Sequence, residues 1–420
     1  MSSAPASSPT SILDTDLYKL TMQQAVLHHF PNVSAKYRFT NRDKTRLFSR
    51  HSVERFRTAV SQFTDLTLTQ QERQWLHKTC PYFKPAYLSF LASYRYKPEQ
   101  VRITFVPVSA DGLLGNVEIQ VCGPWTETIL WEVPLMATLS ECFFHSVDVD
   151  WNYDNQEQAA YIKGRSLLEA GCIFSEFGTR RRRSYHTQDL VVGALVRASR
   201  DAPKKGRLSG TSNVHFAQKY DLTPIGTIAH EWFMGVAAIK GYENTHSTSL
   251  DLWEAVYSDS LLVALTDTFT TSAFFKDFTA DPERVQKWRG LRQDSGDPFA
   301  FGPRVKEMYE SLGIDPRRKA IIYSDSLSVD KAIQLQGQAK ELGFEQVSYG
   351  IGTFFTNDFH TASSGSGGTE KSKALNIVIK LSSVNNKPCV KISDDITKNT
   401  GDQATVEYVK RLYNLNIVDT

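Results

Sequence analysis

Residues 320–353 read AIIYSDSLSVDKAIQLQGQAKELGFEQVSYGIGT, and this stretch sets the expected fold class. Two short apolar runs, Ala320–Tyr323 and Val347–Ile351, bracket a longer segment of helical character. Each run ends in small or polar residues, which is typical of a strand that stops at a loop. A strand, a helix and a second strand in this order predict a parallel βαβ unit.

The same alternation recurs upstream, from about Asn152. Further apolar runs end in Gly, Ser, Thr or Asp, and a more helical stretch follows each of them. The runs are Cys172–Phe177, a weak one before Gly210, Pro224–Ala229, Leu261–Thr266 and a weak one around Leu291. A spacing of roughly 20 to 35 residues is what βα units give. Together with the two runs above, seven units predict an irregular seven-stranded parallel α/β barrel over residues 151–374.

The region before the barrel, residues 11–150, mixes helices and strands. Ala35–Thr40 and Val117–Val121 alternate between apolar and polar residues as half-buried strands do. Leu135–Val147 follows Pro134 and predicts a helix. We expect an N-terminal α+β domain with an open sheet.

The region after the barrel, residues 375–420, predicts antiparallel structure. Leu375–Leu381 and Pro388–Ile392 flank Asn385-Asn386, a dipeptide that favours a hairpin turn. We expect this segment to return to the sheet of the N-terminal domain instead of closing the barrel.

The composition is that of an ordinary globular protein, with 41% hydrophobic residues, 22% charged residues and a formal net charge of +2. This charge gives no reason to expect nucleic acid or a membrane surface as partner, and no apolar run reaches the ~18 residues of a membrane span. Residues 1–10 lack a secretory signal and are expected to form a disordered tail, and the Ser/Gly-rich residues 361–372 a flexible loop. Five cysteines without a CxxC pair favour reduced thiols in the cytoplasm, with the nucleus as an open alternative.

Chemically useful side chains follow the ends of the seven apolar runs. In a βα barrel the active site lies at the C-terminal ends of the strands, so these residues should meet on one rim. The ends read Glu176-Phe177-Gly178-Thr179-Arg180, Gly210-Thr211-Ser212-Asn213, Gly226-Thr227-Ile228-Ala229-His230-Glu231, Thr266-Asp267-Thr268, Arg292-Gln293-Asp294-Ser295-Gly296-Asp297, Ser324-Asp325-Ser326 and Gly350-Ile351-Gly352-Thr353.

Two of these ends predict phosphate binding. The backbone of Gly350-Ile351-Gly352-Thr353 could bring N–H groups close to a phosphate, although this pattern is also common in plain turns. Ser324-Asp325-Ser326 precedes a predicted helix and could add donors, although Ser326 could equally be an ordinary helix N-cap.

The charged residues of the rim suit a phosphate-bearing substrate. Asp267, Asp294 and Asp297 could hold Mg²⁺ through oxygen atoms and waters, although Asp297 could instead start a helix. Arg180 and Arg292 offer planar forks for a carboxylate or a phosphate. The run Arg180–Arg183 also fits a nucleic-acid patch, but one functional arginine with solvated neighbours is the favoured interpretation.

Two further side chains suggest a ring ligand and a reactive group. Phe177 could stack on a flat ring. His230 lies between an apolar run and a predicted helix start, a position that favours a functional role over simple packing.

Taken together, these motifs resemble the nicotinate phosphoribosyltransferases of the fungal type across nearly the whole chain. The segments that carry the resemblance are Leu13-Asp14-Thr15-Asp16-Leu17-Tyr18-Lys19 with Thr21-Met22, Thr40-Asn41-Arg42, Phe174–Arg181, Gly210–Asn213, Gly226–Glu231, Leu265–Thr268, Arg292–Asp297, Tyr323–Ser326 and Gly350–Thr353. The resemblance implies a type II phosphoribosyltransferase fold. At the motif positions this sequence does not depart from the pattern of the family.

The resemblance also implies a reaction. Nicotinate and 5-phosphoribosyl 1-diphosphate would give nicotinate mononucleotide and pyrophosphate, with Mg²⁺ as cofactor and ATP as co-substrate, in the salvage route to NAD. In the family the segment around Tyr18 reaches the site of a neighbouring subunit, which implies a homodimer.

The resemblance assigns a role to each matching position. The pyridine ring would lie between Tyr18 and Phe177, with Arg180 and Ser212 at the nicotinate carboxylate. Arg292 would bind near the substrate and its phosphates, and Asp267 and Asp294 would lie near the ribose, the pyrophosphate and Mg²⁺. Ser324–Ser326 and Gly350–Thr353 would form a cradle for the 5-phosphate. His230 would be phosphorylated by ATP.

Several alternatives stay open. A nicotinamide phosphoribosyltransferase would need an amide acceptor, typically Asp, where Ser212 stands. A quinolinate enzyme would need a denser basic cluster, and a barrel aldolase would need a Schiff-base lysine that none of the seven ends contains. A nucleic-acid-binding protein using Arg180–Arg183 and Lys204-Lys205 is disfavoured by the near-neutral charge and the lack of interleaved aromatic residues.

Overall fold

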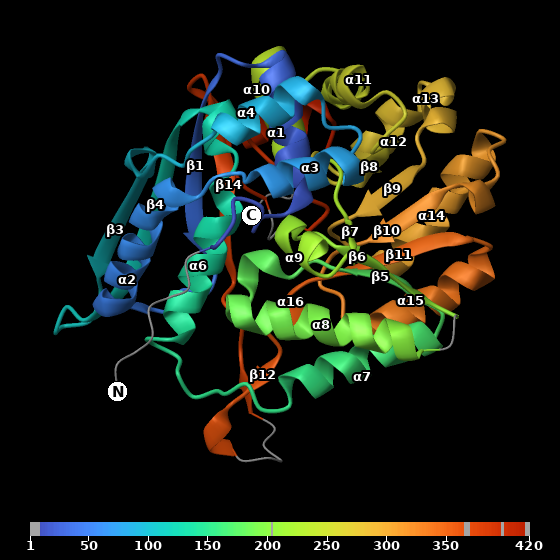
Figure 1. Cartoon of the computed structure of the whole chain (residues 1–420). Helices are drawn as coiled ribbons and strands as arrows, with labels where there is room; N and C mark the ends of the chain where they lie inside the picture. The colour runs from blue at the N-terminus through green and yellow to red at the C-terminus, as the bar shows by residue number, and fades with distance from the viewer. Residues whose placement is uncertain (1–8, 203–204, 365–369, 396–398, 416–420) are drawn as a thin grey trace.

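The computed structural model describes residues 9–202, 205–364, 370–395 and 399–415. Two sheets organise the chain: an antiparallel sheet on the left of Figure 1 and a parallel sheet on the right. The expected N-terminal tail lies outside the described residues except for Pro9 and Thr10, and residues 365–369 of the expected flexible loop lie outside them as well. None of the helices described is both long and apolar enough to cross a membrane.

The parallel sheet confirms the seven predicted βα units. Its strands are ordered β7-β6-β5-β11-β10-β9-β8, and every pairing between neighbours is parallel. The sheet curls into a half-barrel, and β7 and β8 form its two edges in the described part of the chain. Its strands are β5 Ile173–Glu176, β6 Arg207–Thr211, β7 Thr223–Pro224, β8 Val263–Leu265, β9 Gly290–Gln293, β10 Ala320–Tyr323 and β11 Gln346–Ile351.

One predicted strand is much shorter than expected. The apolar run Pro224–Ala229 contributes only Thr223–Pro224 as β7, and residues 225–229 are irregular. A Cβ on Gly226 would lie 2.9 Å from the backbone nitrogen of Tyr18, so this run packs against the start of helix α1. Apolar character therefore marks burial here, but the burial is against a helix and not within the sheet.

Helices alternate with the strands of the half-barrel along the chain. Ser328, Asp297 and Asn213 accept from backbone N–H groups in the first turns of α15, α14 and α9, which fixes where these helices begin. The helices are α7 Gln156–Glu169, α8 Tyr185–Asp201, α9 Val214–Lys219, α10 His230–Lys240, α11 Thr245–Tyr257, α12 Thr271–Thr279, α13 Pro282–Lys287, α14 Pro298–Ser311, α15 Val329–Leu342 and α16 Thr353–Thr356.

The antiparallel sheet confirms the expected open-sheet domain. Its order is β15-β14-β1-β4-β2, with β3 paired to β4. The strands are β1 Ser34–Asn41, β2 Phe48–Ser49, β3 Val101–Pro107, β4 Leu114–Pro124, β14 Ile377–Val384 and β15 Lys387–Pro388, and the helices of this part are α1 Leu17–His29, α2 Arg50–Ser61, α3 Gln70–Thr79, α4 Pro85–Ser93, α5 Trp125–Thr128 and α6 Glu132–Phe144. Helix α6 begins before Pro134, because proline in a first turn removes an N–H that would have no helical partner.

The C-terminal segment returns to the first sheet and then turns back to the barrel. β14 pairs with β1 along its length, and Asn385 and Asn386 both have positive φ, as the predicted hairpin requires. After β15 the chain leaves that sheet: the N–H of Ile392 donates to the carbonyl of Thr268 beyond β8, and Ile392 forms a bridge with Phe269. The last helix, α17 Gln403–Leu412, follows.

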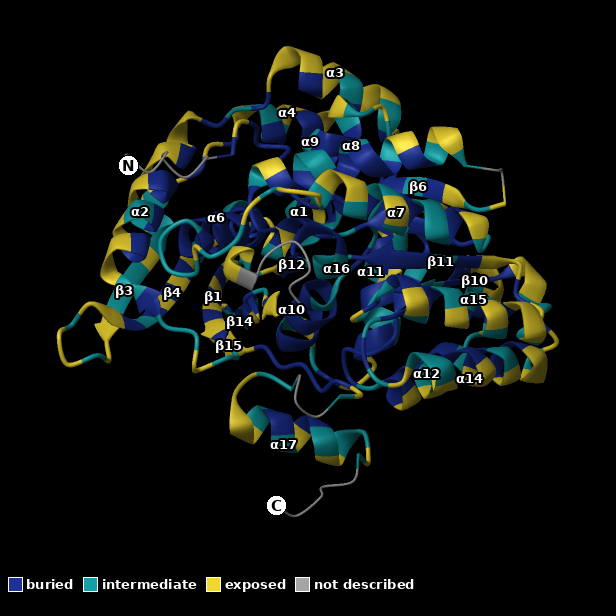
Figure 2. Cartoon of the chain, turned by 90° about the horizontal axis from the view of Figure 1, so that it is seen from below, coloured by how far each residue is buried: buried dark blue, intermediate teal, exposed yellow. Residues whose placement is uncertain are grey.

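The core is continuous between the two sheets. Helices α1, α6 and α10 lie between them, and all thirteen residues of α6 are buried. Figure 2 shows these helices in the dark blue interior, with exposed residues on the outer helices. The two sheets therefore share one core.

The last two residues of the expected loop 361–372 form a short strand. The strand β13 Lys371–Ser372 pairs with β12 Phe359–His360, and Ser372 is buried. The guanidinium of Arg183 donates to both the hydroxyl and the carbonyl of Ser372.

Candidate active site

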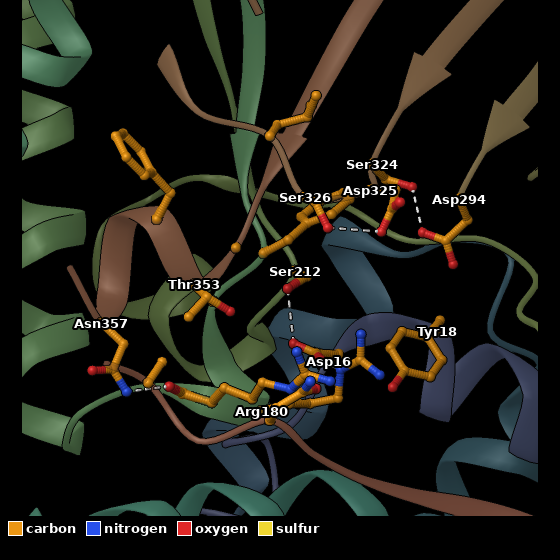
Figure 3. A pocket seen from close by; sticks show the side chains of 18 of the residues that line it. Asp16, Tyr18, Arg180, Ser212, Asp294, Ser324, Asp325, Ser326, Thr353 and Asn357 are labelled. Carbon is orange, nitrogen blue, oxygen red and sulfur yellow. Dashed lines mark hydrogen bonds and ion pairs between the residues drawn. The ribbon is translucent and has the colours of Figure 1, made fainter. Parts of the chain in front are cut away.

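A cavity of about 1090 Å³ opens at the C-terminal ends of the parallel strands. The barrel rim forms one wall, and the N-terminal domain with the C-terminal segment forms the other. The predicted site residues that line it are Tyr18, Phe177, Arg180, Ser212, His230, Arg292, Asp294, Ser324, Asp325, Ser326, Gly352 and Thr353, many of which are drawn in Figure 3. Residues far apart in sequence thus meet on one surface, as the βα pattern predicts.

Three predicted site residues do not line the cavity. Asp267 is buried directly behind His230. Gly350 faces the ring of Phe177, because a Cβ on Gly350 would lie 2.3 Å from Phe177 Cε2, so this glycine gives room to an aromatic side chain. Asp297 caps helix α14, since its carboxylate accepts from the N–H of Phe299 at 2.9 Å. In the structure Gly350 packs against Phe177 and Asp297 caps α14, and the ligand contacts expected of both residues stay predictions.

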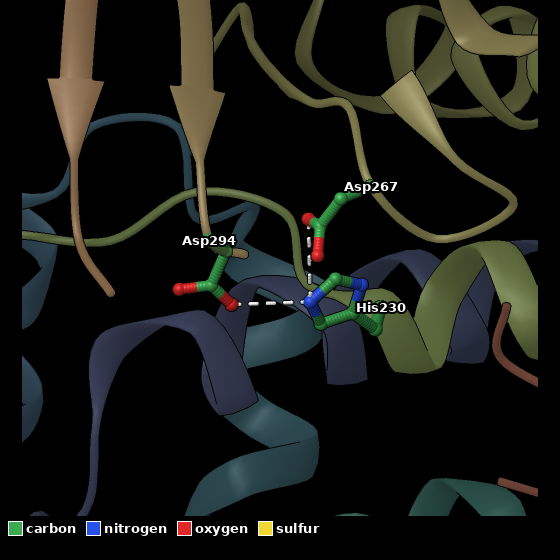
Figure 4. A group of neighbouring side chains, drawn as sticks. All are labelled: His230, Asp267 and Asp294. Atoms are coloured by element: carbon green, nitrogen blue, oxygen red, sulfur yellow. Dashed lines mark hydrogen bonds and ion pairs between the residues drawn. The ribbon is translucent and has the colours of Figure 1, made fainter. Parts of the chain in front are cut away.

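His230 is the first residue of α10 and lies between two carboxylates, Asp267 and Asp294 (Figure 4). Its Nε2 is 3.0 Å from Asp294 Oδ2 and 3.6 Å from Asp267 Oδ1. Its Nδ1 is 3.0 Å from the hydroxyl of Thr268. A fourth group, the ammonium of Lys391, lies 2.9 Å from Nε2 and 3.0 Å from Asp267 Oδ2.

The electrostatics around His230 favour a neutral imidazole flanked by charged groups. Burial, and then the ammonium of Lys391, lower the pKa of His230 from its ordinary value of 6.5 to about 4. Burial opposes ionisation of Asp294, but Arg292 and then His230 outweigh it and hold the pKa of Asp294 well below its usual range. His230 is therefore uncharged at neutral pH and has a nitrogen lone pair available.

The lowered pKa of His230 predicts a pH dependence of stability. Between about pH 6.5 and pH 4 the unfolded chain binds a proton at this histidine and the folded chain does not, so the free energy of unfolding falls as the pH falls through this window. His230→Asn removes this contribution. Urea unfolding at pH 7 and pH 5 should show a smaller loss for His230→Asn than for wild type, and equal losses in both proteins would contradict a neutral buried His230.

One end of the cavity is suited to a flat anionic ring. The guanidinium carbon of Arg180 lies 5.9 Å from the centroid of the Tyr18 ring, and the side chain of Arg180 is 46% exposed. The hydroxyl of Ser212 donates to Asp16 Oδ1 at 2.8 Å, and Arg180 Nε is 4.0 Å from Asp16 Oδ2. Burial raises the pKa of Asp16 against the opposing effects of Arg180 and Ser212.

Tyr18 lines the cavity of its own chain, and its expected contact with a second subunit stays a prediction. The backbone N–H of Leu17 donates to the carbonyl of Ser212, and Asp16 forms a bridge with Asn213, so the start of α1 is fixed on the rim of the same chain.

The other end of the cavity carries polar groups at the ends of β10 and β11. The hydroxyl of Ser324 donates to Asp294 Oδ1 at 2.8 Å, and that of Ser326 donates to Asp325 at 3.1 Å. Ser326 has a positive φ of 49° and is not the N-cap of α15, because that role belongs to Ser328. A serine held in this backbone conformation at a cavity wall favours the functional interpretation over simple capping.

The arginine run is not a solvated patch. Arg182 is buried and paired with Asp14 at 2.7 Å, and Arg183 is buried against the ring of Phe144. Only Arg180 and Arg181 line the cavity. This corrects the expectation of solvated neighbours and leaves no basic surface for nucleic acid in this run.

Several cavity residues were not predicted as site residues. All but Asn357, which follows α16, come from the N-terminal and C-terminal segments: Asp16, Asn41, Arg42, Lys44, Asn357, Lys380 and Lys391. Thr40-Asn41-Arg42 was a motif without an assigned role, and its position after an alternating strand was the available signal. Lys380 and Lys391 had no local signal, because only the return of the chain between the sheets brings them here. Burial, followed by Lys391 and Arg42, lowers the pKa of Lys380 to about 7.

The carboxylates near His230 are a poor fit for a resident divalent cation. The ligand atoms of His230, Asp267 and Asp294 lie within 4.8 Å of one another. The ammonium of Lys391 already lies among them, and Asp294 is engaged by Ser324 and Arg292. The ammonium of Lys391 supplies the positive charge that a metal ion would otherwise bring to these carboxylates. The described residues therefore do not form an all-protein Mg²⁺ cage.

An open α/β barrel that meets an antiparallel sheet over a cationic cavity defines a type II phosphoribosyltransferase. Comparison with known proteins identifies the family. The model of the nicotinate phosphoribosyltransferase (NAPRTase) family matches residues 172–417, and that of its N-terminal domain matches residues 13–140. The chain therefore belongs to the nicotinate phosphoribosyltransferase family.

Individual relatives agree with this assignment. The chain is 43% identical over 403 residues to a probable nicotinate phosphoribosyltransferase of Schizosaccharomyces pombe, covering 95% of this chain and 96% of the relative. It is 41% identical over 408 residues to the nicotinate phosphoribosyltransferase of Saccharomyces cerevisiae, covering 95% and 94%. A crystal structure from Saccharomyces cerevisiae superposes with a TM-score of 0.94 at 40% identity, covering 99% of this chain and all of the other.

Proposed function

We propose that this protein joins nicotinate to the ribosyl group of 5-phosphoribosyl 1-diphosphate, releasing pyrophosphate, and that ATP drives the reaction through a phosphohistidine at His230. One observation carries the proposal: a neutral histidine, whose side chain is 18% exposed, lies in the same cavity as an exposed arginine fork and a polar rim. The product, nicotinate mononucleotide, is a precursor of NAD.

The ring end of the cavity supports an acid as substrate. Arg180 presents two parallel N–H groups that match a carboxylate, and Tyr18 offers a ring face beside it. Because the hydroxyl of Ser212 already donates a hydrogen bond to Asp16, the carboxylate of nicotinate would bind the guanidinium of Arg180 and not this hydroxyl. The alternative, nicotinamide, would gain an acceptor from Asp16 but would bring no negative charge of its own to Arg180.

Glycosyl transfer needs charge stabilisation more than a general base. The pyridine nitrogen is already a nucleophile, and it forms the bond to ribose C1 as the bond from C1 to the diphosphate oxygen breaks. Arg292, Lys391 and Lys380 face the cavity and can neutralise the leaving pyrophosphate. Mg²⁺ would enter with the phosphate-bearing substrates as their usual counterion, since the protein offers it no complete cage.

His230 has the features of a phosphoryl acceptor. Thr268 can hold the proton on Nδ1, which leaves the Nε2 lone pair for the γ-phosphorus of ATP. The Nε2–phosphorus bond forms as the bond from that phosphorus to the bridging oxygen breaks, and ADP leaves. The ammonium of Lys391, close to Nε2, offsets the charge of the new phosphoryl group.

One experiment tests the substrate and the role of ATP together. The protein is incubated with 5-phosphoribosyl 1-diphosphate, Mg²⁺ and either nicotinate or nicotinamide, with and without ATP, and the nucleotide formed is identified. We expect nicotinate mononucleotide as the main product and a clear stimulation by ATP. Equal turnover of nicotinamide would overturn the substrate assignment, and equal rates without ATP would overturn the phosphohistidine.

Tyr18 should hold the pyridine ring. Stacking on an aromatic face contributes about 1–3 kcal/mol per ring, so Tyr18→Ala should raise the KM for nicotinate about 5- to 150-fold and change that for the phosphoribosyl donor much less. Tyr18→Phe is the matched control, because it keeps the ring and removes only a buried hydroxyl that has no partner among the described residues. An equal rise in both KM values for Tyr18→Ala would count against stacking.

A further inference from the structure

A chain of buried charges runs behind the cavity, between the helices that separate the two sheets. Its centre is Lys19 on α1, whose side chain is 0% exposed. The ammonium of Lys19 lies 2.5 Å from Glu132 on α6 and is also paired with Glu231 on α10. Three helices from distant parts of the sequence thus share one ion pair network.

Each end of this network contacts the machinery of the cavity. Glu132 Oε1 is 3.4 Å from Nη1 of Arg180, the proposed anchor of the nicotinate carboxylate. Glu231 follows His230 directly in the first turn of α10. The order of charges is therefore Arg180, Glu132, Lys19 and Glu231, alternating in sign from the ring end of the cavity to the histidine helix.

Glu231 is held on its other side by neutral donors. The indole of Trp125 donates to Glu231 Oε1 at 2.9 Å, and the hydroxyl of Tyr37 donates to the same oxygen. Burial opposes the charge of Lys19, but Glu132 and Glu231 outweigh it and raise the pKa of Lys19. Likewise Lys19 and Arg180 overcome burial and lower the pKa of Glu132. Lys19 and Glu132 therefore remain charged at neutral pH, so their arrangement and not their protonation can change.

We propose that Glu132, Lys19 and Glu231 are positioning residues that couple occupancy of the carboxylate site at Arg180 to the placement of His230. The inference rests on the proposed function, because it takes a carboxylate ligand to bind Arg180. It goes beyond that function in assigning the coupling to three buried residues that do not line the cavity.

The coupling follows from competition for charge. A ligand carboxylate at Arg180 competes with Glu132 for the guanidinium. Glu132 then interacts less with Arg180 and pairs more strongly with Lys19. Lys19 then shifts toward Glu132 and holds Glu231 less strongly, which changes the first turn of α10. Charge interactions in a dry interior are strong enough to transmit such a change over two ion pairs. Coupling between two sites is reciprocal, so the state of His230 must also change the affinity for nicotinate.

Two isosteric variants interrupt the network at different points. Glu132→Gln removes the charge that Arg180 and Lys19 share. Glu231→Gln removes the charge next to His230 and does not touch Arg180, while the amide oxygen can still accept from Trp125 and Tyr37. Glu141→Gln is the matched control, because Glu141 is a buried carboxylate on the same helix α6 that accepts from the N–H of Tyr185 and is not paired with Lys19 or Arg180 in the described contacts.

The first measurement needs no ATP. Imidazole nitrogen NMR signals of His230, assigned by their loss in His230→Asn, are recorded with and without saturating nicotinate. The second is the ATP concentration that half-phosphorylates the protein, with and without nicotinate. In wild type and Glu141→Gln we expect the signals to shift and this concentration to change by at least about fivefold. In both network variants the shift should be largely lost and the change should be less than about twofold.

The outcomes separate this inference from the proposed function. No binding of nicotinate to wild type in calorimetry would refute the proposed substrate and with it the inference. An NMR response without any phosphorylation would refute the phosphohistidine and leave the coupling supported. A wild-type response in either folded network variant would overturn the inference, because it would show that nicotinate acts on His230 through the cavity. A purely structural role would lower the unfolding temperature and leave the response unchanged.

Discussion

His230→Asn protein is expected to hydrolyse no ATP above background and to show no stimulation of nucleotide synthesis by ATP. The donor already carries a pyrophosphate leaving group, so ATP must act on the protein and not on the transferred bond. A phosphoryl group on His230 would face the ammonium of Lys391, which lies 2.9 Å from Nε2, and would share the cavity with Arg292. Losing one charge-assisted hydrogen bond of roughly 1.5–3 kcal/mol should raise the KM for the donor about 10- to 150-fold. Slow, ATP-independent synthesis should remain.

The measurement is phosphate bound to the protein after treatment with ATP. Wild type should carry acid-labile, base-stable phosphate that is absent from His230→Asn. His29→Asn is the matched control, because burial also lowers the pKa of His29 but this residue lies outside the lining of the cavity. If His230 only packs at the end of β7, the folded variant will keep proportional ATP stimulation. The same label on folded His230→Asn would refute the assignment.

The parallel half-barrel could be predicted because its signal is repeated and local. The strands of the barrel lie in short apolar runs, weak at β6 and β9, and the loops after β6, β8, β9, β10 and β11 begin with Gly, Ser, Thr or Asp. The run Pro224–Ala229 misled the prediction, since burial against α1 needs the same apolar residues as burial in a sheet. The path of the chain after β15 could not be predicted, because Val390 to Ser393 have no periodicity that distinguishes one sheet edge from another.

The site was predictable where a residue follows a strand and unpredictable where packing decides its role. Arg180, Ser212 and Asp294 lie where the βα pattern places them. Gly350 has the sequence context of a phosphate loop, but its role depends on the ring of Phe177, which approaches from another strand. Lys391 follows no strand of the barrel, and it reaches His230 because β14 pairs with β1 and the next segment then bonds to Thr268 through Ile392.

Arg180→Ala should cost about 2–4 kcal/mol of transition-state binding for nicotinate, a fall in kcat/KM of roughly 30- to 800-fold, by analogy with losing one partner of a desolvated charge pair. The variant should fold, because Glu132 keeps its ion pair with Lys19 when Arg180 is removed. Turnover of nicotinamide should change much less, since an amide offers the guanidinium no opposite charge. The variant should therefore lose most of its preference for the acid.

Steady-state kinetics with both pyridines decide this prediction, and Arg181→Ala is the matched control. Arg181 also lines the cavity, but its Nε donates to the carbonyl of Ile377 at 2.9 Å, so its side chain is held against β14. Both variants remove one positive charge from the same cavity. A loss of nicotinate turnover confined to Arg180→Ala would mean a specific carboxylate contact. Equal losses in the two variants would mean that the cavity acts on nicotinate only through its overall positive potential, which would contradict the role given to Arg180.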